Sequence, residues 1–189
     1  MRLILILLLA TPVGCGDPPT PAPIVGARAV PTGPVALRRL TASQYARSVR
    51  DALGRDLDLA GRLEPDLRRE HLLAVGAAYV TVTSTGLEQY EAMAYRVAAQ
   101  AFDDDHRDDN VPCIPASADA RDDDCAGEAV QALGRRLFRR PLTAEEIATR
   151  VTLAGEAATR LSDFYGGLEF ALASLLTSPN FLFRVPTVE

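Results

Sequence analysis

The sequence predicts an all-α fold, a small bundle of about five amphipathic helices arranged in two packed lobes. Helix-start signals of the capping-box type occur three times, and each precedes apolar residues at helical spacing. The stretch from Ala77 to Thr83 is rich in β-branched residues, but no second strand is evident to pair with it. We therefore expect this stretch to be an extended lead-in rather than part of a sheet.

The first two expected helices lie in the front half of the chain. Thr41 to Gln44 is a capping box that opens a helix over residues 42–53, which Gly54 ends. Thr85 to Glu88 is a second box and opens a helix that runs to about Ala101. Small residues on the inner face of this second helix predict a close approach by another helix.

Three more helices are expected in the second half. One covers residues 126–139 and is ended by Pro141. The third capping box, Thr143 to Glu146, opens a helix through Leu161, and the last helix covers residues 163–177 before Pro179. These elements divide the chain into a domain at 37–101, an acidic loop at 102–125 and a domain at 126–189.

The N-terminus is typical of an exported protein. Residues 1–14 combine Arg2, a short apolar run and small residues, which predicts a signal peptide. Cys15 follows at the cleavage point and resembles the lipid-accepting cysteine of a bacterial lipobox, although Pro12 replaces the usual leucine. We expect acylation of Cys15 and an outer-membrane lipoprotein. The alternative is ordinary cleavage near Ala10 or Gly14, which gives a periplasmic or secreted protein.

Residues 15–36 hold the lipidated cysteine and a proline-rich linker that predicts an extended tether. Beyond the linker, the basic residues are all arginine, which we attribute to genome composition rather than to anion recognition. The net charge of −5 argues against nucleic acid as a partner.

The loop at 102–125 carries nine aspartates against two arginines, a local charge of −7, so we expect it to be solvated. Cys113 and Cys125 lie near its end and form an even pair once Cys15 is assigned to lipid, which predicts a disulfide. Closing a loop of this size stabilises a fold by about 3 kcal/mol.

The same loop offers carboxylate oxygens of the kind that calcium prefers. The candidate ligands are Asp103, Asp105, Asp108, Asp122 and Asp124. The alternation of ligand and spacer found in an EF-hand is missing, so a solvated loop is the preferred interpretation and no metal site is assigned.

Two groups of residues are candidates for interaction. Arg135, Arg136, Arg139 and Arg140 cluster at the end of the third helix. They are expected to cap that helix and to pair with Glu145 or Glu146, with binding of an anion as the alternative. The apolar tail that contains Phe181 and Phe183 is expected to dock on a partner, because so small a body has little room to bury it.

We find no motif for catalysis or for a cofactor. A nucleophile elbow, a haem-attachment motif and a glycine-rich phosphate loop are all absent from the sequence. We therefore expect that this chain, as it stands, is not an enzyme and carries no cofactor.

Three stretches together resemble the planctomycete-type secreted domain family. They are Leu37 to Gly54, Arg135 to Glu146, and Ser178 to Arg184. The resemblance covers about residues 37–184 and implies the two front helical domains of a longer architecture of unknown function, sometimes accompanied by a cytochrome c domain. It implies a naturally short member or the front of an interrupted gene, and it supports the Cys113–Cys125 pair.

These observations favour an envelope interaction or scaffold module that is anchored to the membrane by lipid and contacts a protein partner or further domains. Two alternatives stay open. One is an accessory to an extracellular polymer-degrading or electron-transfer enzyme, and the other is a calcium-binding surface module.

Overall fold

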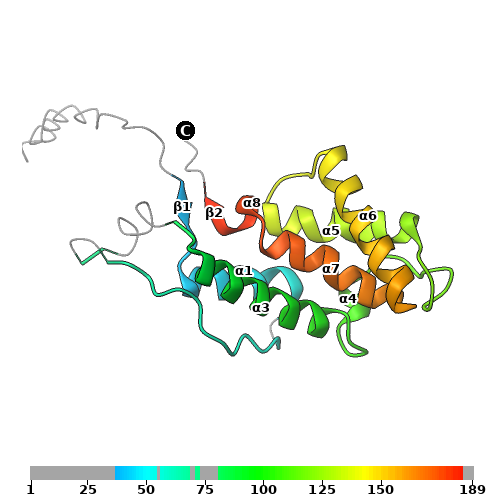
Figure 1. The fold of residues 1–189 in the computed structure, drawn as a ribbon, viewed down its shortest axis with the longest axis horizontal. Helices are drawn as coiled ribbons and strands as arrows, with labels where there is room; N and C mark the ends of the chain where they lie inside the picture. The colour runs from blue at the N-terminus through cyan, green and yellow to red at the C-terminus, as the bar shows by residue number, and fades with distance from the viewer. Residues whose placement is uncertain (1–36, 55, 69–70, 73–80, 185–189) are drawn as a thin grey trace, which may run out of the picture. The chain divides into compact units, whose positions relative to one another are not determined.

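The structure, a computed structural model, describes residues 37–54, 56–68, 71–72 and 81–184. All of them belong to one compact unit, residues 34–189. The signal peptide, Cys15, the proline-rich linker and most of the Ala77–Thr83 stretch lie outside the described residues. Within them the fold is helical with one very short sheet, which confirms the all-α prediction (Figure 1).

Helix α1, Ala42–Leu53, forms as its capping box predicts. The Thr41 hydroxyl accepts a hydrogen bond from the backbone N–H of Gln44, and the Gln44 side chain accepts one from the Thr41 N–H. Its buried face includes Tyr45 and Val49. The helix ends at Gly54, whose φ of 135° is unfavourable for any residue with a side chain.

Helix α3, Ser84–Ala101, begins two residues earlier than the sequence predicts. Its N-cap is Thr83 rather than Thr85, and the Thr83 hydroxyl accepts a hydrogen bond from the N–H of Gly86. The sequence favours Thr85, which is followed three residues later by Glu88, over Thr83, which is followed by Gly86. Glu64 decides between them, because its carboxylate accepts hydrogen bonds from both the N–H and the hydroxyl of Thr83.

The three helices of the second half also agree with the prediction within a few residues. They are α5, Asp123–Phe138; α6, Ala144–Leu161; and α7, Phe164–Leu176. The cap of α6 is the predicted box, with Thr143 and Glu146 bonded reciprocally. Helix α5 starts three residues earlier than predicted because Asp122, a member of the acidic run, is its N-cap.

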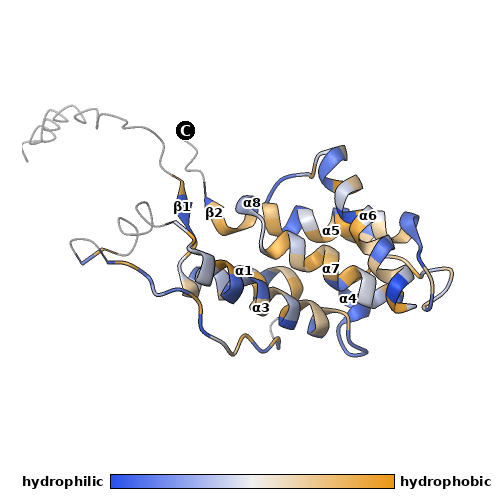
Figure 2. Cartoon of the chain, in the orientation of Figure 1, coloured by the Kyte–Doolittle hydropathy of each residue, from blue (hydrophilic) through white to orange (hydrophobic). Residues whose placement is uncertain are grey.

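The two predicted lobes meet in one continuous hydrophobic core, which extends along the chain from Leu40 to Leu182. Helix α7 contacts α3, α5 and α6 and is the most hydrophobic of the labelled helices in Figure 2. Gly167 permits the close contact with α6, since a Cβ there would lie 2.5 Å from the carbonyl oxygen of Ala154. The most extensive helix contact lies within the back half, between α6 and α7, and packing of α7 on α3 joins the back half to the front.

Two short strands join the beginning and end of the described chain. Strand β1, Arg38–Arg39, pairs antiparallel with β2, Phe183–Arg184, with Arg38 opposite Arg184. Helix α8, Pro179–Leu182, leads directly into β2. The sequence did not predict these elements, because each is at most four residues long and the strand partners lie far apart in the chain.

The apolar tail is largely buried, which corrects the expectation that so small a body has little room to bury it. Phe181 is 0% exposed and packs edge-on against Tyr45, with ring centroids 5.4 Å apart. Leu182 is also buried, whereas Phe183 stays partly exposed. Pairing of β2 with β1 holds the tail against the bundle, and Phe181 packs into the core beside Tyr45 of α1.

The acidic segment, residues 102–125, is less solvated than its charge predicts. Helix α4, Arg107–Asn110, forms inside it, and Asn110 and Val111 are buried. The Asn110 amide donates hydrogen bonds to the carbonyls of Leu53 and Ala101 at 3.1 Å each. One uncharged side chain thus fastens the segment to the ends of α1 and α3 while its aspartates stay near the surface.

Candidate functional site

A groove of about 710 Å³ lies where β1, the end of α5, α8 and β2 meet. We call it the basic groove. Its lining residues are Leu37, Phe138, Arg139, Arg140, Pro179, Asn180, Phe183 and Arg184. It therefore combines two of the predicted arginines with one of the two predicted phenylalanines.

Apolar side chains form part of the groove wall. Phe138 is buried, and the guanidinium carbons of Arg140 and Arg150 lie 5.4 and 5.5 Å from the centre of its ring. Leu37 is 57% exposed at the start of β1. Leu37 and the partly exposed Phe183 give the groove accessible hydrophobic surface beside its charges.

Arg140 is held by a carboxylate, as the sequence predicts. Its two terminal nitrogens donate to the two carboxylate oxygens of Glu146 at 2.7 and 2.8 Å. Glu146 also accepts from the N–H of Thr143 and from the Asn180 amide. The hydrogen bonds from Arg140, followed by that from Thr143, lower the pKa of Glu146 to about 2.

Arg139 has a different environment. It is the C-cap of α5 in the left-handed conformation, with φ of 59°, and one of its terminal nitrogens lies 3.4 Å from the Ser48 hydroxyl. Partial burial, and then the positive charge of Arg184, lowers the pKa of Arg139. Arg184 in turn lies opposite Arg38 in the strand pair. Like charges directly opposite each other destabilise a strand pair, so the concentration of positive charge at this end lowers the stability of the fold.

The other two predicted arginines lie outside the groove. Arg136 donates to the carbonyl of Ala52 at 2.9 Å and so joins α5 to the end of α1. Its partial burial lowers the pKa of Arg136, an effect that the Asp109 carboxylate opposes. Arg135 is exposed on α5. Of the predicted cluster of four, two arginines thus line the groove, Arg136 packs against α1 and Arg135 is exposed.

A buried ion pair next to the groove has no signal in the sequence. Arg39 is 3% exposed and donates to Glu64 at 2.6 Å and to the Pro65 carbonyl at 3.2 Å. Glu64 also binds Thr83, while Asp66 accepts from the N–H of Ala42 at the start of α1. This network ties the loop at 56–68 to β1 and to the starts of two helices.

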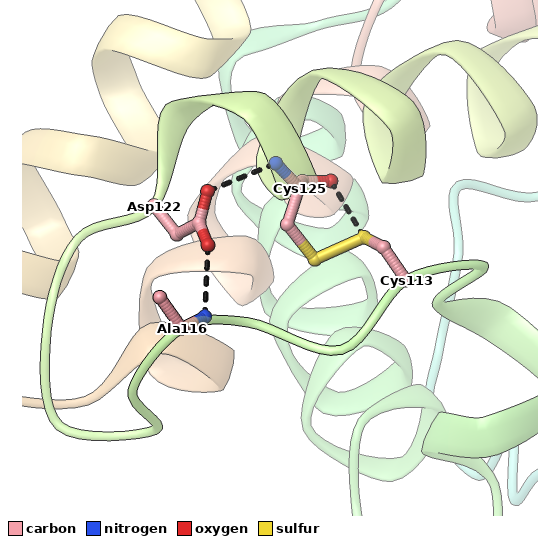
Figure 3. Close-up of a disulfide and its surroundings, with 4 residues drawn as sticks. All are labelled: Cys113, Ala116, Asp122 and Cys125. Atoms are coloured by element: carbon pink, nitrogen blue, oxygen red, sulfur yellow. Dashed lines mark hydrogen bonds between the residues drawn. A yellow bond between two sulfur atoms is a disulfide. The ribbon is translucent and has the colours of Figure 1, made fainter.

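At the acidic end the predicted disulfide between Cys113 and Cys125 is present, with Cα atoms 5.6 Å apart (Figure 3). Figure 3 also shows Asp122 between two backbone N–H groups, those of Ala116 at 2.9 Å and Cys125 at 3.0 Å. These hydrogen bonds, with that from Ala116 the stronger contribution, lower the pKa of Asp122. Disulfide and carboxylate together close the loop that leads into α5.

The candidate calcium ligands are dispersed over this end. Asp103 accepts from His106, which lowers the pKa of Asp103, and Asp122 caps α5. Asp108 lies in α4 and Asp124 in the first turn of α5, while the N–H of Asp105 bonds to Asp103. Within the described ranges no three side chains of His, Cys, Asp or Glu come together in a way that could hold a metal ion.

A second, smaller depression lies between α3, α6 and α7. Leu87 and Tyr95 on α3 line it together with Leu153 and Phe170. The rings of Tyr95 and Phe170 meet edge to face with centroids 5.4 Å apart. Its lining also includes Glu91, Ser174 and Thr177, and it has none of the arginines that distinguish the basic groove.

No helix in the described part of the chain combines the length and hydrophobicity that crossing a bilayer requires.

Comparison with known protein families gives two matches. Residues 38–103 match PSD3, a protein family of unknown function (DUF1587), and residues 125–185 match PSD5, a second family of unknown function (DUF1595). No curated protein and no solved structure matches the chain. The first match spans β1 to the end of α3, and the second spans most of α5 to β2. Seven of the eight groove-lining residues lie in the second match, and the eighth, Leu37, directly precedes the first. With two thirds of its length in these two domains, the chain belongs to the planctomycete-type secreted domain family.

Proposed function

We propose that this protein is an exported, lipid-anchored module of the cell envelope that acts by binding through its basic groove rather than by catalysis. The observation that carries the proposal is the composition of that groove, which joins exposed apolar side chains to guanidinium groups beside the strand pair that links the two matched regions.

The chemistry of the lining residues supports binding. Leucine, phenylalanine and proline supply apolar surface, asparagine supplies an amide, and arginine stays protonated at all physiological pH values. General acid–base catalysis near neutral pH needs a group that gains and loses a proton in that range, and a nucleophile needs a hydroxyl, thiol, amine or carboxylate. The groove is suited to hold an apolar, anionic ligand.

Two observations support export and anchoring. Residues 1–14 have the pattern of a signal peptide, and Cys15 follows at its cleavage point. The Cys113–Cys125 disulfide is of a kind that persists in oxidising compartments outside the cytoplasm. Acyl chains on Cys15 would hold the protein at a membrane, for which we propose the outer membrane, without a spanning helix.

The intact mass of the protein extracted from membranes tests this proposal. We expect a chain that begins at Cys15, carries acyl chains on that residue and has lost two hydrogens to the disulfide. The Cys15→Ser variant is the control and should leave the membrane fraction. An unprocessed, fully reduced chain in the soluble extract would overturn the proposal, and cleavage near Ala10 without acylation would overturn the anchor.

A further inference from the structure

Charge is separated along the helices of the bundle. The part of the acidic segment closed by the disulfide precedes α5, and its Ala118 carbonyl accepts from the N–H of Phe164 at the start of α7. The basic groove lies at the other ends of α5 and α7, beside Arg139 and α8. At 1.5 Å per residue, these helices of 16 and 13 residues separate the disulfide loop from the groove by roughly 20 to 24 Å.

This separation exceeds the distance over which salt screens charges, which is about 8 Å at physiological ionic strength. The segment 102–125 carries −7, so the remaining residues together carry +2. The groove lining holds three arginines and no acidic residue, so an anionic surface that approaches it meets local positive charge, although the whole protein is negative.

Three arginines at this end are available to an anion. Arg38, Arg139 and Arg184 are exposed, and none of them forms an ion pair with a carboxylate of the described residues. Arg140, by contrast, is occupied by Glu146. Arg38 and Arg184 lie opposite each other in the strand pair, and the charge of Arg184 lowers the pKa of Arg139. The three charges are therefore held near one another.

The groove is also where the chain enters the domain. Leu37, a lining residue, is separated from Cys15 by 21 residues, which span at most about 75 Å when fully extended. A lipid on Cys15 would confine the groove to this distance from the bilayer, so that contact with the membrane becomes an intramolecular event at high effective concentration.

We propose that the basic groove docks on the phosphate headgroups of an anionic lipid surface. Arg38, Arg139 and Arg184 contact the phosphates, while Leu37 and Phe183 contact the boundary with the acyl chains. The acidic segment faces away from the membrane, because the surface repels it. The inference deepens the proposed function and depends on it for the anchor.

Binding to vesicles tests this docking separately from lipidation. The full chain with Cys15→Ser is mixed with vesicles of phosphatidylglycerol and phosphatidylcholine or of phosphatidylcholine alone, and co-sedimentation measures binding. We expect binding to the anionic vesicles only, with an affinity that falls as salt is raised. Each arginine near an anionic surface contributes about a fivefold gain, so Arg38→Gln/Arg184→Gln should weaken binding about 25-fold.

The matched control is Arg62→Gln/Arg160→Gln, which removes the same charge from exposed positions outside the groove. Its affinity should stay within about twofold of the Cys15→Ser parent, since charges beyond a screening length contribute little. Circular dichroism and thermal unfolding of both double variants verify folding, which we expect to persist because all four side chains are exposed.

Several results would overturn the inference. They are equal binding to both kinds of vesicle, an equal loss in the control variant, and binding to polyglutamate without binding to vesicles, which would indicate an acidic protein partner. Displacement from vesicles by millimolar inorganic phosphate would indicate a site for the free ion. The intact mass of the wild-type chain reports on the anchor alone, so failure of the anchor is distinguishable from failure of the docking.

Discussion

The acidic segment and the basic groove both concentrate charges of one sign, but the fold treats them differently. At the acidic end the backbone and nearby cations bind the carboxylates: Asp122 accepts two N–H groups, Asp103 pairs with His106, and Arg121 pairs with Asp123. At the basic end Arg140 is paired, whereas Arg38, Arg139 and Arg184 lie close together without a carboxylate of the described residues.

The comparison separates structural charge from charge that is available for binding. Carboxylates are readily used inside a fold, because every helix N-terminus and every turn offers N–H donors. Guanidinium groups need carbonyl or carboxylate acceptors, and near the end of α5 Arg136 bonds to the Ala52 carbonyl and Arg140 to Glu146. Arg139, by contrast, contacts the Ser48 hydroxyl at 3.4 Å and forms no ion pair with a described carboxylate. We therefore expect changes at the acidic end to alter stability and changes at the groove surface to alter binding.

The largest expected effect distinguishes the buried core residue behind the groove from its partly exposed neighbour. Phe181→Ala should lower the free energy of unfolding by about 4 kcal/mol, because it removes a fully buried ring that packs on Tyr45. Urea denaturation of the Cys15→Ser chain measures the change. Phe183→Ala, at the partly exposed neighbour, is the control and should cost less than half as much. Equal costs would show that Phe181 is not a core residue.

The next largest effect belongs to the acidic end. Cys113→Ala/Cys125→Ala should lower the free energy of unfolding by about 3 kcal/mol, because the denatured chain regains the freedom of the closed loop. Vesicle binding by the folded variant should be unchanged. A loss of vesicle binding comparable to that of the groove variant would contradict the independence of the two ends.

A smaller effect is expected from the carboxylate beside the disulfide. Asp122→Ala should cost about 1 to 2 kcal/mol at pH 7, since it removes the cap of α5 and the bond to Ala116. The exposed Asp119→Ala is the control and should stay within about 0.5 kcal/mol.

The pH dependence of this stabilisation follows from the direction in which the Asp122 pKa is shifted. The pKa of Asp122 is lowered in the folded state, so its contribution is present above the ordinary aspartate value near 3.8 and is lost as pH falls through the folded value. The difference between wild type and Asp122→Ala should therefore shrink below about pH 4. A difference that grows on acidification would be inconsistent with a charged cap.

The smallest effect concerns the paired arginine of the groove. Glu146→Gln should cost about 0.5 to 1 kcal/mol at pH 7, because it removes a partly exposed ion pair with Arg140. The folded pKa of Glu146 is about 2, below its ordinary value of 4.5, so the stabilisation is present above pH 4.5 and disappears between 4.5 and 2. Urea titrations across this range measure it. Glu145→Gln is the control, and an equal effect there would refute the assignment of the pair.

The helices could be predicted because their signals are local. The capping boxes at Thr41 and Thr143 lie within four residues of sequence and form as expected. The disulfide was expected because two cysteines remain as a pair once Cys15 is assigned to lipid. By sequence Thr85 is the better cap, but Thr83 is the observed one, because a distant residue, Glu64, binds it. A contact between residues distant in sequence selects the N-cap, so a rule based on local sequence could not predict it.

The rest of the site depends on contacts between distant residues. Arg38 and Arg184 become neighbours only through a two-residue strand pair, which has no detectable sequence pattern, and this pairing also buries Phe181. The arginine cluster was recognised from sequence, but its division between Arg136 in packing and Arg139 in the groove depends on where α1 lies. Likewise, the high charge of residues 102–125 led us to expect a solvated loop, so the hydrogen bond from Asn110 to the end of α1 was not predicted.

The chain contains no tryptophan, so single tryptophans can report on the two ends directly. Leu37→Trp at the groove and Ile114→Trp at the acidic end, where Ile114 is 94% exposed, are introduced separately into the Cys15→Ser chain. With phosphatidylglycerol vesicles, the emission of the Leu37→Trp variant should shift to shorter wavelength and be quenched by lipid-borne quenchers, while that of the Ile114→Trp variant stays unchanged. Equal responses at the two positions, or a response at Ile114→Trp alone, would contradict a membrane-facing basic end.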